Sequence, residues 1–290
     1  MDWLRNTTRP VEDWFTSAKL PVGRTSEAVV EWLTDNAAPI FTAMEDGLDA
    51  LIEAILAVIQ FLPPLVTILL IAFLAWLLHR SLRLAVLTLA GLLLILNLGF
   101  WEETTETLTL VLSATFVCMA IGVPIGIYLA HHPRAFRAAR PVLDLMQTLP
   151  TFVYLIPAIV FFGIGMVPGL VATVIFVVPA PIRLTQLGIA STPRQLVEAG
   201  QAFGATGWQL LRKVELPYAW PQIAAGLTQT VMLSLSMVVI AALVGADGLG
   251  VPVVRALNTV DIGKGFEAGL AIVVVAILLD RLLRISGRRA

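Results

Sequence analysis

The sequence is short of charge and of the groups that bind nucleotides. Charged residues make up 13% of its 290 positions and hydrophobic residues 58%, whereas soluble domains carry about 25% charged residues. The three lysines, Lys19, Lys213 and Lys264, all lie outside any GxxxxGK[ST] phosphate-binding loop. We therefore expect an integral membrane protein that binds no ATP, magnesium or other cofactor of its own.

Cysteine and histidine are equally scarce. The single cysteine, Cys118, lies in an apolar run and cannot form a disulfide within the chain. His131 and His132 have no third metal ligand near them, and the motifs HExxH and GxSxG are absent. These absences predict no metal site and no catalytic residue, so we do not expect an enzyme. The sequence starts with MDWLRNTTRP, which is not a basic region followed by an apolar one, so we expect no cleaved signal peptide.

Long apolar runs are what the sequence has in quantity. A helix needs about 20 apolar residues to cross a hydrocarbon core about 30 Å thick. A glycine- and proline-containing break, GIGMVPG at 163–169, divides a long uncharged stretch, so we expect a tight hairpin of two spans there. The sequence predicts an all-α integral membrane fold with about seven transmembrane helices, at 63–79, 84–100, 107–130, 149–163, 168–183, 223–245 and 266–283.

Lysine and arginine placement predicts how these spans are oriented. If residues 80–83, 131–140, 183–221 and the C-terminus share one side, 13 of the 19 basic residues gather there. Basic residues concentrate in cytoplasmic loops. We therefore expect a multi-pass protein with its C-terminus in the cytoplasm and its N-terminus outside.

Residues 1–62 are predicted to form a separate acidic arm. It carries ten acidic residues and three of the seven tryptophans. Two roles stay open: a helix on the membrane surface or against the spans, or a docking element for an extracytoplasmic partner. Within 44–62 the pattern is that of an amphipathic helix, with Asp46, Asp49 and Glu53 on one side and an apolar set on the other: Leu48, Leu51, Ile52, Ile55 and Ile59.

One long polar stretch, EAGQAFGATGWQLLRKVELP at 198–217, lies between two apolar segments. Thr192 and Pro193 predict the start of a helix, as cap and first helical residue. Gly204 predicts its end, because glycine tolerates the left-handed conformation of a C-terminal turn. A second short helix is expected over 206–216 and is predicted to stop at Pro217. The two helices would form a rigid cytoplasmic module.

The spacing within this module resembles the EAA loop of bacterial ATP-binding-cassette import permeases. Two positions depart from that pattern: Gly200 stands where the family has a second alanine, and Val214 where it has isoleucine. Both replacements are small or close in shape, so the resemblance holds. The matching positions are Glu198, Ala199, Gly200, Gly204, Val214, Leu216 and Pro217.

Three further segments extend the resemblance over about residues 65–285. They are LVLSATFVCMAIGVPIGIYLA, PVLDLMQTLPTFVYLIPAIVFFGIGMVPG and LSLSMVVIAALVGADGLG, and they are similar to permeases of glycine betaine, proline betaine or choline importers. The resemblance implies a type-I importer permease core over 101–285 with a cytoplasmic coupling loop at 190–221. Residues 63–100 would then be two accessory helices, and 286–290 a basic cytoplasmic tail.

The resemblance also implies partners and a location. A coupling loop would seat on a cytoplasmic ABC ATPase, present in two copies and carrying the ATP and magnesium. A permease homodimer in the lipid of a bacterial inner membrane would receive its cargo from an extracytoplasmic binding protein, and no nucleic acid is involved. Glu198, Ala199, Gly200 and Gly204 would make the ATPase contact; the alternative is that 193–217 packs only on its own spans.

Polar residues inside the spans are candidates for a translocation path, because unneeded polar groups are avoided in hydrocarbon. Hydrogen bonds between helices explain them equally well. No aromatic cage for a quaternary ammonium is visible, so we expect a separate binding protein to select the cargo. The path candidates are Gln147, Thr148, Tyr154, Gln229 and Ser234, and GADGLG supplies a gate or a simple loop at Gly245, Gly248 and Gly250.

The competing interpretation is an ATP-independent secondary transporter or channel. Such proteins use charged residues within their spans as relays or ion ligands. The predicted mid-span positions carry no charge, so we favour the importer permease. Which quaternary ammonium osmolyte it carries stays open.

Overall fold

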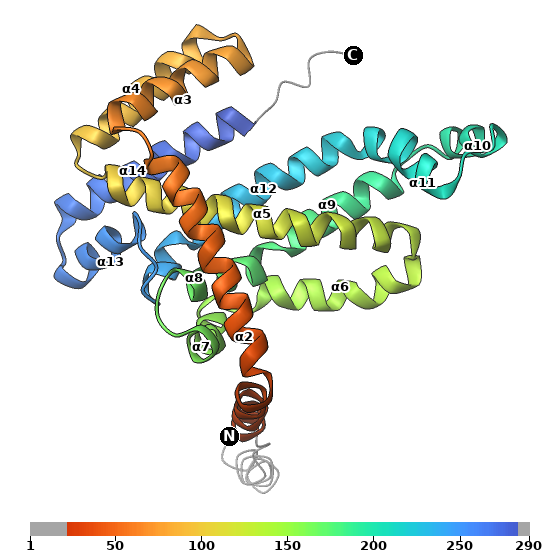
Figure 1. Ribbon diagram of the computed structural model, residues 1–290, viewed down its shortest axis with the longest axis horizontal. Coiled ribbons are helices and arrows are strands. Elements are labelled where there is room, and N and C mark those ends of the chain that lie inside the picture. The colour runs from red at the N-terminus through yellow and green to blue at the C-terminus, as the bar shows by residue number, and fades with distance from the viewer. Residues whose placement is uncertain (1–21, 284–290) are drawn as a thin grey trace, which may run out of the picture. The chain divides into compact units, whose positions relative to one another are not determined.

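The structure is a computed structural model that describes residues 22–283. It divides into two compact units, Met1–Thr42 and Ala43–Ala290. Residues 22–283 contain helices and no strand, which confirms the predicted all-α class. The first elements in chain order (Figure 1) are α2 (Val22–Gln60), α3 (Pro64–His79), α4 (Leu82–Asn97), α5 (Trp101–His131), α6 (Pro133–Thr148), α7 (Phe152–Phe162) and α8 (Met166–Val177). They are followed by α9 (Pro179–Ala190), α10 (Arg194–Ala202), α11 (Gly207–Leu210), the π-helix η1 (Leu211–Glu215), α12 (Leu216–Ala242), α13 (Gly250–Thr259) and α14 (Ile262–Leu283).

The second unit begins with the C-terminal part of α2, the predicted amphipathic helix. Ile52 is buried and the other four apolar positions are half-buried, whereas Asp46, Asp49 and Glu53 are exposed. This distribution confirms the predicted faces. The side-chain amide of Gln60 donates a hydrogen bond to the Thr105 hydroxyl at 2.8 Å, so the end of α2 is fixed to α5.

Helices α3 and α4 pack together as a hairpin (Figure 1). Arg80 makes the turn in a left-handed conformation, with φ 48°. Ser81 then caps α4, where its hydroxyl accepts a hydrogen bond from the Leu84 N–H. Each helix has 16 residues, which is about 24 Å at 1.5 Å per residue and somewhat less than the hydrocarbon thickness. On its other side α4 packs closely against α14, where a Cβ on Gly91 would lie 2.9 Å from Val274 Cγ1.

The centre of the second unit is the contact of α5, α9 and α12, which run side by side (Figure 1). Small residues make this contact close, as is common between helices in membranes. A Cβ on Gly126 of α5 would lie 2.7 Å from the Ile182 carbonyl oxygen of α9. A Cβ on Gly188 of α9 would lie 3.0 Å from Ala219 Cβ of α12. Side chains larger than glycine therefore cannot enter either crossing without separating the helices.

The chain around the predicted 163–169 turn is arranged differently from the prediction. Helix α7 has only 11 residues and meets α6 at a bend of 94°, so 149–163 is the second half of a bent pair rather than a span by itself. The turn itself is present: Gly163 and Gly165 both have positive φ, and the Gly165 N–H donates to the Val244 carbonyl. The bond ties the turn between α7 and α8 to the end of α12.

The span predicted at 168–183 is longer than expected. Helices α8 and α9 together form a segment of 25 residues, Met166–Ala190, that is apolar and long enough to cross a membrane. Arg183 therefore lies inside this segment and does not begin the following loop. The expectation that the spans carry no charge away from their ends is wrong at this position, because Arg183 was counted with the loop.

By length and composition, four segments of residues 22–283 can cross a membrane, or up to six if each bent pair counts as one. The four are Trp101–His131, Met166–Ala190, Gly207–Ala242 and Ile262–Leu283. The predicted spans at 107–130, 223–245 and 266–283 lie almost wholly within three of them. The bent pairs join α2 to α3 and α6 to α7, and α4 is a shorter apolar helix.

Candidate functional site

The polar segment starts with α10, a helix in which no residue is buried. It begins one residue later than predicted, because Pro193 has an extended ψ of 131° and stands at the cap position that we assigned to Thr192. Glu198 and Ala199 are both exposed. The Glu198 carboxylate lies 3.1 Å from the Arg194 guanidinium one turn earlier on the same helix, so it is available to a competing partner.

A glycine turn ends α10 where the sequence predicts it. Gly204 has φ +76°, and its N–H donates to the Gln201 carbonyl at 2.9 Å. Gly200 has a different role, in packing. A Cβ at this position would lie 2.8 Å from Leu210 Cδ1, so the small size of glycine lets α10 pack on α11. The predicted contact of Gly200 with an ATPase stays a prediction.

The second helix of the segment does not stop at Pro217, which corrects the prediction. Thr206 and Gln209 form a capping box at the start of α11. The π-helix η1 follows and continues directly into α12, giving one apolar segment from Gly207 to Ala242. Pro217 lies in the first turn of α12, where the backbone hydrogen bonds change from the π to the α pattern. The N–H that proline lacks is tolerated at this position. The second helix of the module, from Gly207 onward, is therefore a direct extension of the span.

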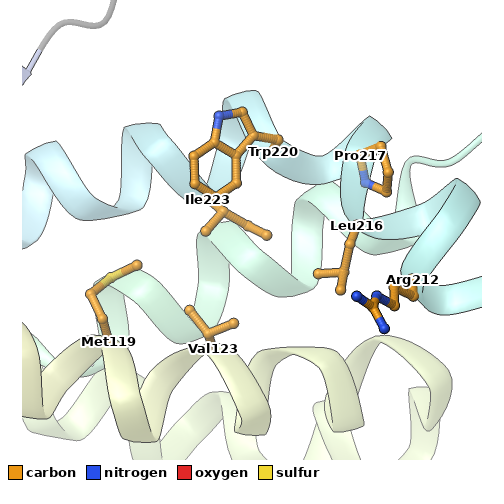
Figure 2. A pocket seen from close by; sticks show the side chains of 7 residues that line it. All are labelled: Met119, Val123, Arg212, Leu216, Pro217, Trp220 and Ile223. Carbon is orange, nitrogen blue, oxygen red and sulfur yellow. The ribbon is translucent and has the colours of Figure 1, made fainter. Parts of the chain in front are cut away.

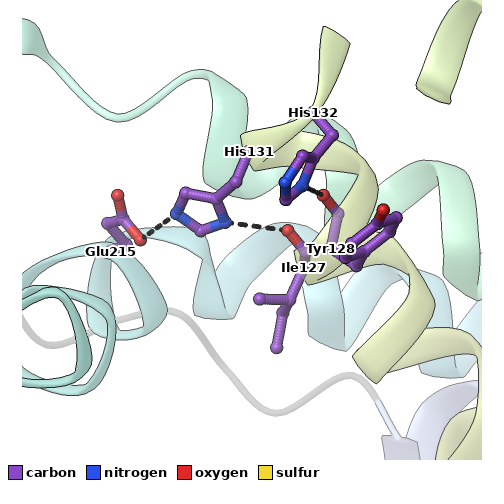
Figure 3. A network of polar contacts seen from close by, with 5 residues as sticks. All are labelled: Ile127, Tyr128, His131, His132 and Glu215. Carbon is purple, nitrogen blue, oxygen red and sulfur yellow. Dashed lines mark hydrogen bonds and ion pairs between the residues drawn. The ribbon is translucent and has the colours of Figure 1, made fainter. Parts of the chain in front are cut away.

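A buried glutamate ties this extension to the end of α5 (Figure 3). Glu215 in η1 is 7% exposed, and its Oε2 lies 2.9 Å from Nε2 of His131. The other ring nitrogen of His131, Nδ1, lies 2.9 Å from the Ile127 carbonyl oxygen. The adjacent His132 makes the equivalent bond to the Tyr128 carbonyl and stacks on the Tyr128 ring, with ring centroids 4.3 Å apart.

The two contacts of the His131 ring, with the Ile127 carbonyl and the Glu215 carboxylate, require two hydrogens between them. A carbonyl oxygen only accepts hydrogen bonds, so Nδ1 of His131 carries a hydrogen. A second proton must then lie between Nε2 and the Glu215 carboxylate, either on the ring as an imidazolium or on the acid. In both forms the pair has no net charge, which suits the burial of Glu215.

An apolar groove of about 470 Å³ lies beside this joint, between α5 and the start of α12 (Figure 2). Arg212 at one end is its only charged lining residue. Leu216 and Pro217 of the EAA-like pattern both face it, so they belong to the base of the module and not to its tip. The lining residues are Met119, Val123, Arg212, Leu216, Pro217, Trp220 and Ile223.

The predicted path residues lie in two places. Gln147 and Thr148 end α6, and the Tyr154 hydroxyl of α7 donates to the Met146 carbonyl at 3.0 Å, so these three belong to one bend. Gln229 is exposed on α12, whereas Ser234 is buried among the helices. The hydroxyls of Thr148 and Tyr154 donate to backbone carbonyls, whereas the buried Ser234 hydroxyl has no hydrogen-bond partner within the described residues.

The glycines of the GADGLG turn are held tightly against their neighbours. Gly245 and Gly248 have φ +88° and +124°, and a Cβ on Gly248 would lie 2.6 Å from the Thr107 hydroxyl. The following N–H, of Leu249, donates to that hydroxyl at 2.8 Å. Gly250 starts α13 in close contact with the Val238 carbonyl of α12. The turn thus connects α12 with α5, and a gating role stays a prediction.

Comparison with known protein families shows which family the chain belongs to. Residues 122–290 match the family described as "Binding-protein-dependent transport system inner membrane component". The chain belongs to this family. The match covers the module, the joint with His131 and every span from the end of α5 onward, which confirms the resemblance drawn from the EAA-like spacing.

Individual relatives extend the match of this permease to nearly its whole length. It is 46% identical to the glycine betaine transport system permease protein OpuAB of Bacillus subtilis, over 91% of this chain and 93% of that protein. It is 45% identical to the glycine betaine/carnitine transport permease protein GbuB of Listeria monocytogenes, over 93% and 97%. With ProW of Escherichia coli, a glycine betaine/proline betaine permease, identity is 41% over 99% and 82%.

Solved structures show the same fold. A structure of the MetNI methionine ABC transporter in an inward-facing conformation aligns with a TM-score of 0.57 at 24% identity, covering 63% of this permease and 94% of that chain. This likeness supports the predicted type-I permease core.

Sequence reasoning missed two residues of the permease that the structure brings together, His131 and Glu215. They are 84 positions apart, and we judged the histidine only as a metal ligand. The available signal was weak: His131 directly follows the predicted span at 107–130, and Glu215 was expected on the same cytoplasmic side, in the short helix over 206–216.

Proposed function

We propose that this chain is the permease subunit of an ATP-driven importer for a quaternary ammonium osmolyte, with glycine betaine as the first candidate. It would work as a homodimer in a bacterial inner membrane with two copies of a cytoplasmic ATPase and an extracytoplasmic binding protein. The single observation that carries the proposal is the exposed helix α10, joined rigidly to a membrane span in a chain of this family.

The geometry suggests how force would pass from the ATPase to the spans. Glu198 is exposed on α10 and can exchange its bond to Arg194 for a charge-assisted bond to a partner. Movement of α10 would pass to α11 across the 203–206 turn, where Gly200 lies close to Leu210, and then through η1 to α12, which follow α11 without a break. The Glu215–His131 pair would carry the same movement to α5. Closure of the two ATPase subunits would then switch the spans between outward-open and inward-open states.

Two further parts of the proposal rest on the relatives and on charge. The relatives named above are glycine betaine permeases, one of them also for carnitine and one for proline betaine, which supports a quaternary ammonium substrate. The gathering of basic residues beside α10 supports a cytoplasmic module and C-terminus. ATP and magnesium would belong to the partner, since this sequence has no phosphate-binding loop.

The test is a charge reversal at the exposed glutamate. In proteoliposomes that hold the permease, its ATPase and its binding protein, we expect Glu198→Lys to lower ATP-driven glycine betaine uptake by about tenfold or more, as loss of a charged interface contact can. Membrane insertion should be normal. Gln195→Lys, an exposed position on the same helix, adds positive charge as a matched control and should keep uptake within about twofold.

Two results would contradict the proposal. Uptake that continues after ATP depletion would instead support a secondary transporter. Wild-type uptake by Glu198→Lys would remove α10 as the site of coupling.

A further inference from the structure

An ion pair joins two of the membrane segments, and the proposed coupling mechanism does not use it. Arg183 of α9 lies with Nη2 2.7 Å from Oδ1 of Asp144 on α6. The Arg183 side chain is 35% exposed and that of Asp144 is 53% exposed. The pair is therefore open on one side of this chain.

The pair lies well inside the membrane segments. Arg183 is about 10 Å along the helix from Ala190, the end of the 25-residue segment Met166–Ala190. It is thus about 7 Å from the middle of that segment, while half of the hydrocarbon core is about 15 Å thick. Asp144 lies in the first half of the bent pair, Pro133–Thr148, about one helical turn before the bend.

Lipid is an unfavourable cover for the open side of this pair. A charged side chain at the centre of a bilayer costs about 2.5–3.5 kcal/mol or more, and such residues face a polar cavity or the interior of a bundle. The surrounding surface agrees with this. Helix α6 packs its apolar side on the core through Phe136, Ala139, Leu143 and Met146. Its other side carries a polar stripe at helical spacing: Arg137, Arg140, Asp144, Gln147 and Thr148.

We propose that Arg183 and Asp144 form a transient binding site for a zwitterionic substrate on its way through the permease, which rests on the proposed function. The guanidinium of Arg183 would bind the substrate carboxylate, for which its planar fork is suited. Asp144 would attract the quaternary ammonium, which has no N–H and is held by charge alone. Without substrate the two side chains neutralise each other, so neither is left unpaired.

This arrangement also predicts selectivity. A zwitterion replaces both halves of the ion pair at once. A cation without a carboxylate, such as choline, would occupy Asp144 and leave Arg183 without an acidic partner. The site therefore favours betaines over simple quaternary ammonium cations, independently of the selection made by the binding protein.

The experiment uses the complete reconstituted importer and separates this proposal from the proposed function. The wild-type complex is first tested for ATP-driven glycine betaine uptake, whose absence would contradict the proposed function. The double variant Asp144→Asn/Arg183→Gln keeps polar side chains of similar size without charge. We expect its maximal uptake rate to fall by about tenfold or more. Arg137→Gln, which removes a charge from the same stripe of α6, is the matched control and should stay within about twofold of wild type.

The charge exchange Asp144→Arg/Arg183→Asp distinguishes a substrate site from a structural link. The exchanged pair can still join α6 to α9. A substrate that enters in one orientation, however, would meet Asp where its carboxylate should bind and Arg where its ammonium should bind. We expect an assembled complex, judged by size-exclusion chromatography and thermal unfolding, with uptake still about tenfold below wild type. Uptake within about twofold of wild type in either double variant, or failure of both to assemble, would assign the pair to structure alone and overturn the proposal.

Discussion

Two glutamates of one polar segment differ in almost every respect. The side chain of Glu198 is 62% exposed and bonds only to Arg194 on its own short helix. Glu215 has a side chain 9% exposed and bonds to His131 on a different membrane segment. Helix α10, which carries Glu198, buries none of its residues, whereas η1 and the start of α12 pack into a cluster with Ile189, Ala219 and Ile223.

This difference separates the part of the module that can bind from the part that is anchored. An exposed carboxylate on a helix without buried residues can change partners at little cost. A buried carboxylate cannot, because a single unpaired charge in such a place is strongly unfavourable. The segment therefore combines an exchangeable contact on α10 with a fixed joint at η1, and the proposed coupling to an ATPase would need both.

The largest effect is expected from breaking the fixed joint. Glu215→Ala removes the buried carboxylate and leaves His131 without its partner. Removing one member of a buried pair costs about 3–5 kcal/mol, but the His131 side chain is 43% exposed and water can reach it. We therefore expect the free energy of unfolding of the detergent-solubilised complex to fall by about 2 kcal/mol. Uptake should fall as well, because α5 is released from the module.

The matched variant is Glu198→Ala, which removes the exposed carboxylate. Its free energy of unfolding should stay within about 0.5 kcal/mol of wild type. Denaturant titration of both variants measures the difference. Equal losses of stability in the two would show that the two glutamates do not differ in the way described.

The features that sequence could predict are those that depend on neighbouring residues. The end of α10 at Gly204 follows from one glycine, and the two faces of 44–62 follow from helical spacing. Pro217 was misjudged because proline is tolerated in the first turn of an α-helix, and that is where it lies in α12. Here a π-helix precedes it, so the helix of the module runs on into α12, and Leu211 and Leu216 pack there against α5 and α9.

The features that sequence could not predict depend on residues far apart in the chain. The Glu215–His131 bond spans 84 positions and the Arg183–Asp144 bond 39. Apolar runs also do not show where a helix ends: α9 continues past Arg183, whose charge has a partner on α6. Hydropathy counts such a residue as the end of a span, so a charge inside the span was read as a charge outside it.

A smaller effect is expected at the turn between the two regions. Gly204→Ala places a side chain at φ +76°, where nothing lies within 4 Å, so the cost is backbone strain and not a clash. Left-handed backbone costs a residue with a Cβ about 1 kcal/mol, which corresponds to about fivefold faster amide hydrogen exchange in α10. Gly207→Ala is the control, because that glycine has an ordinary φ and equally open surroundings. It should leave exchange unchanged or slow it slightly. The same acceleration in both variants would mean that the turn does not depend on the left-handed conformation.

The smallest effect is expected at Arg194, the partner of the exposed Glu198 on α10. Arg194→Gln breaks the bond to Glu198 and leaves the carboxylate in place. Both side chains are largely exposed, at 90% and 62%, and pairs of this kind one helical turn apart contribute about 0.3–0.5 kcal/mol. Amide exchange in α10 should therefore accelerate by about twofold or less. Coupling of uptake to ATP hydrolysis should persist, because the carboxylate offered to the ATPase is unchanged. A loss of coupling as large as that of Glu198→Lys would mean that Arg194 itself contacts the partner, and that the exchangeable contact on α10 is a pair of charges instead of one.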